Sequence, residues 1–303
     1  MTSFDVDCIS DVVSNPSGTQ ANAVSKLLTD LDFIAFDVET TGLSPIACKL
    51  VELSAVRFRL GSKETSVFST LIHPETSIPE EVTAIHGITD EMVKDAPPAK
   101  DAIPAFLQFI GDENAVLIAH NAAFDVGFLR VAVGRLGITP PNNPVVDTLQ
   151  LARCLISDVP NYQLKTLAEF YGVVSVEYHR ALSDSFHVRE IFEQMTRGSK
   201  QQLSSLSDLD DFNCLMRLAA DETEWEVPAE FAGHASQIRK AIADGLEVRM
   251  VYRGAGTTHR PRVVKPLALL ESRGNFYLSA FCPRVEAERT FRIDRIQSLH
   301  VLT

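Results

Sequence analysis

The sequence lacks several features that would each place it in a particular class of protein. Its five cysteines are odd in number and form no Cys-x-x-Cys pair, so neither a disulfide framework nor a zinc site is indicated. No apolar run approaches the roughly 18 residues of a membrane-spanning helix. The N-terminus also lacks the basic-then-apolar order of a secretory signal. We therefore expect a soluble, cytoplasmic protein that has reduced thiols and no membrane contact.

Basic residues are also scarce, because 28 Lys and Arg stand against 40 Asp and Glu, giving a net charge of -12. The deficit is uneven: residues 234–303 carry 12 Lys and Arg against 6 Asp and Glu. This asymmetry predicts two units with different tasks, of which the basic one is the candidate for contact with a polyanion. A basic surface without a ligand is the alternative. At 303 residues and 45% hydrophobic content, the chain is long enough for two domains.

Two carboxylates interrupt an otherwise apolar stretch that runs from Phe33 to Leu43. Alternate residues of a strand share a face, so Asp37 and Glu39 are expected to point the same way, opposite Phe36. Burying two like charges is costly unless a cation neutralises them, and hard divalent ions take oxygen ligands. Solvated turn acids or a local salt bridge would explain an isolated Asp-x-Glu equally well. A metal site therefore requires further carboxylates elsewhere in the chain.

Strands and helices are expected to follow one another as far as residue 198. The periodicity and turn signals predict strands at 50–60, 65–72, 115–119 and 145–146. They predict helices at 98–110, at 121–136, at 164–171, one that begins at residue 147, and one that begins within 178–184 and runs to about 195. Asn121 is a natural N-cap for the helix that follows it, and Asp125 falls in the first turn of that helix. A carboxylate is favoured there by the helix dipole alone, so Asp125 in isolation does not indicate a site.

Four motifs occur in order: Phe36-Asp-Val-Glu-Thr-Thr-Gly-Leu43, Ile85-His-Gly-Ile-Thr89, Ala119-His-Asn-Ala-Ala-Phe-Asp125 and His179-Arg-Ala-Leu-Ser-Asp184. With them, residues 30–198 resemble the DEDDh 3′–5′ exonucleases, which include the epsilon proofreading subunit of bacterial replicative polymerase. The four together are far more specific than any one. The resemblance implies an α/β, RNase H-like fold, namely a mixed sheet of five strands with helices on both sides.

The resemblance also implies the roles of individual residues. Asp37, Glu39, Asp125 and Asp184 would hold two divalent metal ions, Mg²⁺ or Mn²⁺, for hydrolysis of a phosphodiester. His179 would accept the proton of the attacking water, a task that suits an imidazole. Other residues are expected to contact the terminal nucleotide or border the site: Thr40, Thr41, Leu43, His86, His120 and Asn121. We interpret His187 as structural and Asp147 as a helix cap.

The chain changes character after residue 198. Residues 199–236 read as an acidic linker with one helix near 212–220, and residues 1–29 as a partly disordered N-terminal segment. From residue 237 a short helix and four strands, at 247–253, 262–270, 275–282 and 289–296, predict a small, strongly bent β-barrel.

Three further motifs occur in order: Val251-Tyr-Arg, Phe276-Tyr-Leu and Arg289-Thr-Phe-Arg-Ile-Asp-Arg-Ile296. With them, residues 237–303 resemble the WYL domain, with Phe276 in place of the tryptophan of its name. The resemblance implies an SH3/Sm-like barrel whose arginines and aromatics bind nucleic acid or nucleotide ligands. The expected contacts are Arg253, Arg260, Arg262, Arg284, Arg289, Arg292, Arg295, Tyr252, Phe276 and Tyr277.

The leading hypothesis is a metal-dependent 3′–5′ exonuclease that releases nucleoside 5′-monophosphates. By analogy with the family we favour single-stranded DNA, a role in repair or maintenance and a bacterial-type cytoplasmic location, while RNA stays open as the substrate. The WYL unit would bind or sense the strand. The competing hypothesis is a nucleic-acid-responsive regulatory protein that uses the nuclease fold as a binding platform. The complete acid set favours the enzyme. The sequence gives no indication of the oligomeric state.

Overall fold

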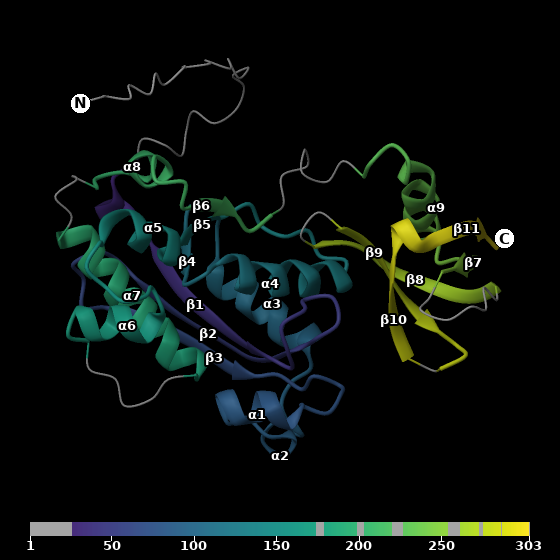
Figure 1. Cartoon of the computed structure of the whole chain (residues 1–303), viewed down its shortest axis with the longest axis horizontal. Helices are drawn as coiled ribbons and strands as arrows, with labels where there is room; N and C mark the ends of the chain where they lie inside the picture. Colours follow the sequence, from purple (N-terminus) through teal and green to yellow (C-terminus); the bar gives the residue numbers. More distant parts are fainter. Residues whose placement is uncertain are drawn as a thin grey trace, which may run out of the picture.

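The structure is a computed structural model that describes residues 26–173, 179–198, 203–219, 227–253, 261–272, 275–285 and 287–302. A larger mixed sheet flanked by helices and a smaller antiparallel sheet near the C-terminus organise the chain (Figure 1). Most of the predicted N-terminal segment, as far as residue 25, lies outside the described residues, as does Arg260. No helix of the described part is long and apolar enough to cross a membrane.

The larger sheet has six strands: β1 (Phe33–Thr40), β2 (Leu50–Phe58), β3 (Thr65–Leu71), β4 (Val116–Ala119), β5 (Pro144–Asp147) and β6 (Leu215–Arg217). Their order is β3-β2-β1-β4-β5-β6, in which the β1–β4 and β4–β5 pairs are parallel and the other pairs antiparallel. The register of β1 with β2 places Glu39 opposite Glu52. Directly paired residues share a face of a sheet, so these two acids lie on the same side.

The sheet has one strand more than we predicted, and the extra strand comes from the segment read as a linker helix. Near 212–220 the chain forms β6, and the helix of this segment, α8 (Leu206–Asp210), lies earlier and begins with a capping box between Ser205 and Asp208. The helix prediction was wrong because β6 pairs with the open edge of β5. Tertiary pairing of this kind overrides a weak local pattern.

Helices cover both faces of this sheet. They are α1 (Glu80–His86), α2 (Asp90–Val93), α3 (Ala99–Ile110), α4 (Ala123–Arg135), α5 (Thr148–Leu155), α6 (Leu164–Phe170) and α7 (Ala181–Gly198), besides a 3-10 turn, η1 (Leu28–Asp30). Ile34 and Phe36 of β1 pack into a core with α3 and α4, whereas Phe33 and Ala35 pack on the opposite face with α5, α6 and α7. The predicted alternation of β1 is confirmed, and Asp37 and Glu39 continue the α7 face.

The smaller sheet has the order β10-β9-β8-β7-β11. Its elements are α9 (Ala232–Ala243), β7 (Val248–Tyr252), β8 (Pro261–Ser272), β9 (Asn275–Cys282), β10 (Ala287–Arg292), the 3-10 turn η2 (Ile293–Arg295) and β11 (Ile296–Val301). The single strand predicted at 289–296 is interrupted by η2, where Ile293 turns into the core, and a fifth strand, β11, follows. The described pairings leave β10 and β11 at opposite ends of the order, so the closed barrel stays a prediction.

An apolar contact joins the two sheet units. Val131 of α4 and Ile46 pack with Ala268 and Leu270 of β8 and with Tyr277 of β9. A Cβ added at Gly134 would lie 3.1 Å from Leu270, so the helix approaches the strand closely. The helix whose first turn carries Asp125 therefore rests on the smaller sheet near its other end, as Figure 1 shows.

Candidate active site

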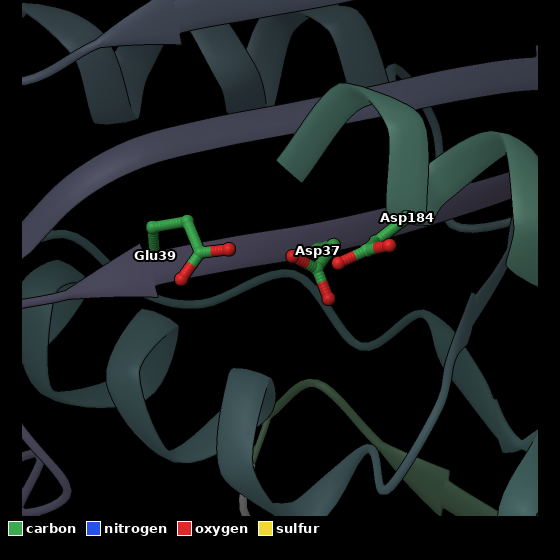
Figure 2. Close-up of side chains that lie close together, drawn as sticks. All are labelled: Asp37, Glu39 and Asp184. Atoms are coloured by element: carbon green, nitrogen blue, oxygen red, sulfur yellow. The ribbon is translucent and has the colours of Figure 1, made fainter. Parts of the chain in front are cut away.

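Three carboxylates converge at the C-terminal half of β1. Oxygen atoms of Asp37, Glu39 and Asp184 all lie within 4.8 Å of one another. Figure 2 shows Asp184 reaching from the first turns of α7 toward Asp37 on β1, with Glu39 farther along the strand. Two acids spaced by two residues share a strand face, and α7 crosses that face, so the third acid comes from a distant part of the sequence. This is the arrangement we predicted for three of the four acids.

The fourth predicted acid lies beside this group rather than within it. Asp125 is buried in the first turn of α4, and its Oδ1 accepts a hydrogen bond from the backbone N–H of Val38 at 3.2 Å. The prediction that Asn121 caps this helix was wrong: Ala122 holds the N-cap position, and Asn121 has a left-handed φ of 64°. Asn121 instead donates its backbone N–H to Asp147 Oδ1 at 3.1 Å, which fixes the turn between β4 and α4.

Burial makes three acids of this site, Asp37, Glu39 and Asp125, reluctant to ionise. It raises the pKa of Asp37 well above its ordinary value, with repulsion from Asp125 and Glu39 adding to the shift. Burial is also the main cause that raises the pKa of Glu39 to about 8 and that of Asp125 to about 8. A divalent cation would remove this cost, because it supplies the positive charge that lets neighbouring carboxylates ionise together. The all-oxygen donor set fits a hard ion such as Mg²⁺ or Mn²⁺.

His179 lies at the rim of the same site. It lies two residues before Ala181, the first residue of α7, it is exposed and it has a left-handed φ of 61°. Its backbone N–H donates to Asp184 Oδ2 at 3.1 Å. A cleft of about 940 Å³ is bordered by His179, Asp37 and Asp184. The imidazole and two of the acids therefore face one solvent-filled space.

The opposite wall of this cleft was not predicted from the sequence. It is formed by the end of α5 and the loop into α6, and it includes the exposed cations Arg153 and Lys165 and the half-buried Tyr162. No motif marks this wall, because a single Lys or Arg on a short helix is common on any surface. Only the fold brings the two cations to the cleft.

The turn after β1 is shaped by its own hydroxyl groups. Thr40 Oγ1 donates to the carbonyl of Gly42 at 2.7 Å, and Thr41 Oγ1 accepts the backbone N–H of Lys49 at 2.9 Å. Gly42 has a φ of 153°, and a Cβ there would lie 2.8 Å from Cys48 Sγ, so the position has no room for a side chain. Leu43, by contrast, is 81% exposed. Of the three predicted nucleotide contacts in this turn, Leu43 is the side chain that is open to a ligand.

Two of the predicted border histidines are held by internal hydrogen bonds. His120 Nε2 lies 2.9 Å from the carbonyl of Tyr162 and Nδ1 lies 3.0 Å from Thr148 Oγ1, while burial lowers the pKa of His120. Because a carbonyl only accepts, Nε2 carries the proton, and the ring is a neutral link between β4 and the cleft wall. His86 is buried, accepts the backbone N–H of Ile88 at 3.0 Å and has its pKa lowered by burial.

Two residues interpreted as structural have clear partners. Asp147 caps α5 by accepting the N–H of Leu149 at 2.9 Å, as predicted. His187 is buried one turn beyond Asp184, and its Nδ1 lies 3.4 Å from Asp184 Oδ1. It therefore supports Asp184 at Oδ1, whereas His179 contacts Oδ2.

A fifth acid of the same sheet face was missed. Glu52 of β2 is buried and forms a two-pronged ion pair with Arg180, the residue after His179. The available signal was the same as for Asp37, namely a carboxylate inside an apolar strand, and it applied equally to the run Leu50-Val-Glu-Leu53.

The predicted contacts of the smaller sheet fall into two groups. Arg253, Arg284, Arg289 and Arg295 are exposed. The side chains of Arg262 and Arg292 have partners inside the unit. Arg262 stacks over the rings of Tyr252 and Phe291, and Arg292 pairs with Asp294 at 2.8 Å.

The two other aromatic residues proposed for base stacking pack against the protein itself. Phe276 is buried in the core of the smaller sheet, so its ring is not available to a base. Tyr277 packs against the apolar contact between the two units. Tyr252 is half-exposed, packs against the same core as Phe276 and lies under Arg262.

Comparison with known families identifies both units. The exonuclease family model of the RNase T type matches residues 34–192, which is more than half of the chain and includes Asp37, Glu39, Asp125 and Asp184. The chain belongs to the exonuclease family. The WYL domain model matches residues 233–301 of this chain. As a member of this family the chain is a nuclease, the family depends on divalent metal, and Asp37, Glu39 and Asp184 form an acidic cluster that could hold such an ion.

Several relatives carry the name DNA polymerase III PolC-type. This chain is 35% identical to the PolC-type protein from Caldanaerobacter subterraneus subsp. tengcongensis over 264 residues, which cover 85% of this chain and 18% of that protein. It is 39% identical to the one from Bacillus subtilis over 182 residues, 60% of this chain and 12% of that protein. The chain thus spans less than a fifth of the length of these relatives.

Solved structures resemble this chain in fold. The zinc-bound form of the E. coli ExoI–ssDNA complex matches with a TM-score of 0.51 at 15% identity, over 89% of this chain and 64% of that chain. Exonuclease I from Methylocaldum szegediense matches with a TM-score of 0.51 at 16% identity, over 90% and 65%. At such low identity these likenesses show the fold alone.

Proposed function

We propose that this chain is a metal-dependent 3′–5′ exonuclease that releases nucleoside 5′-monophosphates, with single-stranded DNA as its preferred substrate. The observation that carries the proposal is the convergence of Asp37, Glu39 and Asp184 on a cleft that also presents His179. An acid set that is costly to bury and all-oxygen in its donors has a chemical use with divalent metal and little without it.

The residues of the site divide the work of hydrolysis between them. Asp37, Glu39, Asp125 and Asp184 would hold two Mg²⁺ or Mn²⁺ ions, which when bound supply positive charge to the scissile phosphate and lower the pKa of water. His179 accepts the proton of the attacking water, because its imidazole borders the cleft beside Asp37 and Asp184. His187 holds Asp184 in place from within α7.

The cleft and the turn after β1 give the strand a path to the acids. Arg153 and Lys165 on the far wall offer positive charge to the phosphates next to the scissile one. Leu43, exposed at the end of β1, provides an apolar surface for the terminal base.

The WYL unit is proposed to hold the strand beyond the cleft. We place this unit at residues 237–303, the exonuclease unit at 30–198 and a closed barrel around the core of the smaller sheet. Arg253, Arg284, Arg289 and Arg295 are exposed, and the apolar contact with α4 holds their sheet against the exonuclease unit. An exposed, basic module fixed beside an acidic nuclease suits recruitment of a polyanion.

The preference for DNA rests on the relatives. The PolC-type proteins are named as DNA polymerases, and one structural neighbour is described as an exonuclease I complex with single-stranded DNA. We propose a role in DNA repair or maintenance, and the same comparison supports it. RNA is the alternative substrate of the same site, and it enters the experiment below as a separate arm.

The proposal is tested by incubating the full chain with Mg²⁺ or Mn²⁺ and DNA or RNA oligonucleotides labelled at the 5′ end. We expect a ladder that shortens from the 3′ end, 5′-mononucleotides as the products and faster turnover of single-stranded DNA than of RNA. A 3′-phosphorylated oligonucleotide and an excess of chelator are the two controls. Full turnover in chelator, or shortening from the 5′ end, would contradict the proposal.

A further inference from the structure

A partly buried ion pair, between the buried Glu52 and the one-third exposed Arg180, connects β2 to the start of α7. Arg180 Nη2 donates to Glu52 Oε1 at 2.9 Å, and Arg180 Nε donates to Glu52 Oε2 at 3.2 Å. Glu52 is 3% exposed, and its partner lies 128 positions away in the sequence. A carboxylate with so little contact with water is costly to keep ionised, and the planar guanidinium fork offsets that cost in one defined orientation.

The same carboxylate also holds the backbone of the helix. Glu52 Oε2 accepts the N–H of Ala181, the first residue of α7, at 3.0 Å. The first N–H groups of a helix have no partner within the helix, so this bond fixes the start of α7 to β2. Both oxygens of Glu52 are used by the start of α7, which argues against Glu52 as a further metal ligand.

The residues held in this way are the ones the reaction needs. His179 directly precedes Arg180, and Asp184 donates its backbone N–H to the Arg180 carbonyl at 3.0 Å. On the strand side, Glu52 is the direct cross-strand partner of Glu39. The pair thus joins the strand that carries Glu39 to the segment that carries His179 and Asp184.

We propose that Glu52 and Arg180 act together as positioning residues that set His179 over the acid cluster. This inference rests on the proposed exonuclease function and deepens it. Neither residue touches the reacting phosphate in this account. Their effect runs through the geometry of the helix start, where a displacement of about 1 Å can lower a rate by roughly 10²-fold.

The experiment compares Glu52→Gln and Arg180→Met with a matched control on the same helix. Glu193 is also a buried glutamate paired with arginines, Arg197 at 3.0 Å and Arg189 at 3.6 Å, but it lies more than two turns beyond Asp184. Each variant is measured for kcat, KM and thermal unfolding, on a single-stranded oligonucleotide in Mg²⁺ or Mn²⁺. Arg180→Lys keeps the positive charge and loses the two-pronged guanidinium, so it separates the effect of the charge from that of the geometry.

We expect kcat to fall roughly ten- to a hundredfold in Glu52→Gln and Arg180→Met, less in Arg180→Lys and less than twofold in Glu193→Gln. Adding His179→Ala should lower kcat much less in the Glu52→Gln background than in the wild-type chain, because a base that is already misplaced contributes little to the rate. If Glu52→Gln does not fold, the same cycle is run on Arg180→Met.

Three results would overturn the proposal. The first is a kcat of wild-type size in folded variants, and the second is an equal loss in Glu193→Gln. The third is a His179→Ala penalty that is the same in both backgrounds, since a purely structural pair would leave that factor unchanged. A wild-type chain without nuclease activity would instead contradict the proposed function, so the two failures are distinguishable.

Discussion

His179 is tied to Asp184 through its backbone and not through its ring. The N–H of His179 donates to Asp184 Oδ2 at 3.1 Å, which leaves the exposed imidazole at the edge of the cleft. The left-handed φ of 61° at His179 makes this turn possible. The proposed base and the proposed metal ligand are therefore positioned together, but their contributions can be tested separately by mutation.

Replacing His179 by alanine should remove the base and keep the acid in place. The backbone bond to Asp184 does not depend on the side chain, so metal binding should change little. We expect kcat to fall roughly 10²-fold, the contribution typical of general-base catalysis. Steady-state kinetics and Mn²⁺ titration of the same protein would check this. A kcat of wild-type size, or a loss of metal affinity as large as the loss of rate, would contradict the assignment.

Metal binding should release protons and tighten as the pH rises. Burial raises the pKa values of Glu39 and Asp125 to about 8, so near neutral pH both groups are largely protonated without metal. A bound divalent ion requires them to be ionised, hence protons and metal compete. Calorimetry at pH 6.5 and 8.5 should show weaker Mn²⁺ binding and more protons released at the lower pH. Affinity that is independent of pH would contradict this account.

The same shifts predict how the metal-free protein responds to pH. A carboxyl with a raised pKa in the folded state binds more protons folded than unfolded, so stability falls as pH rises from the ordinary carboxyl range to about 8. In chelator, the melting temperature should therefore decline across this interval. Added Mg²⁺ or Mn²⁺ should stabilise most at the alkaline end. Glu39→Gln should flatten the decline, and an unchanged slope in that variant would contradict the prediction.

Leu43 offers a test of substrate contact that does not disturb the fold. Its side chain is 81% exposed, so Leu43→Ala should change stability by less than about 0.5 kcal/mol, as surface substitutions usually do. If the side chain contacts the terminal base, the variant should lose affinity equivalent to about 1 kcal/mol, seen as a KM several times higher. Ile85, exposed on α1, provides an alanine control of similar size. Equal kinetics for the Leu43 and Ile85 variants would exclude the contact.

The sequence predicted the parts of the site that depend on local periodicity. Alternation along β1 indicated that Asp37 and Glu39 share a face, and the packing of Ile34 and Phe36 on the opposite side confirms it. The position of Asp184 on α7 beside Asp37 could not follow from periodicity, because it depends on how a helix crosses the sheet. For that residue the family motif supplied what local physics could not.

The parts that the sequence did not predict depend on partners distant along the chain. The strand β6 exists because β5 offers it an open edge, and Glu52 is explained only once Arg180, 128 positions later, lies beside it. Arg153 reaches the cleft because α5 ends there. In each case the sequence shows the residue itself but not the neighbour in space that explains its role.

The basic face of the WYL unit should make binding of long strands sensitive to salt. Each phosphate contact that is lost reduces the magnitude of the negative slope of log K against log salt by about 0.7 for a single strand. The triple variant Arg284→Ala, Arg289→Ala and Arg295→Ala should flatten this slope for a long strand. A trinucleotide should be hydrolysed at nearly the wild-type rate.

Deleting the unit would be a poorer test, because it would expose the apolar contact around Val131 and Leu270. The matched control replaces Arg59, Lys63 and Lys94 by alanine, since these are exposed cations of the exonuclease unit away from the cleft. An equal change in slope for both triple variants would show that the effect comes from net charge and not from the WYL face.

The most direct test of the acid site is Asp37→Asn, which removes one charge and almost no volume. Asp37 is the acid whose pKa burial and its neighbours raise most clearly, so the neutral amide should be accepted by the fold. We predict an unchanged or higher melting temperature in chelator, loss of Mn²⁺ binding by calorimetry, and a 3′–5′ exonuclease rate lower by roughly 10³-fold or more. A folded Asp37→Asn protein that shortens single-stranded DNA from its 3′ end at the wild-type rate would contradict the account.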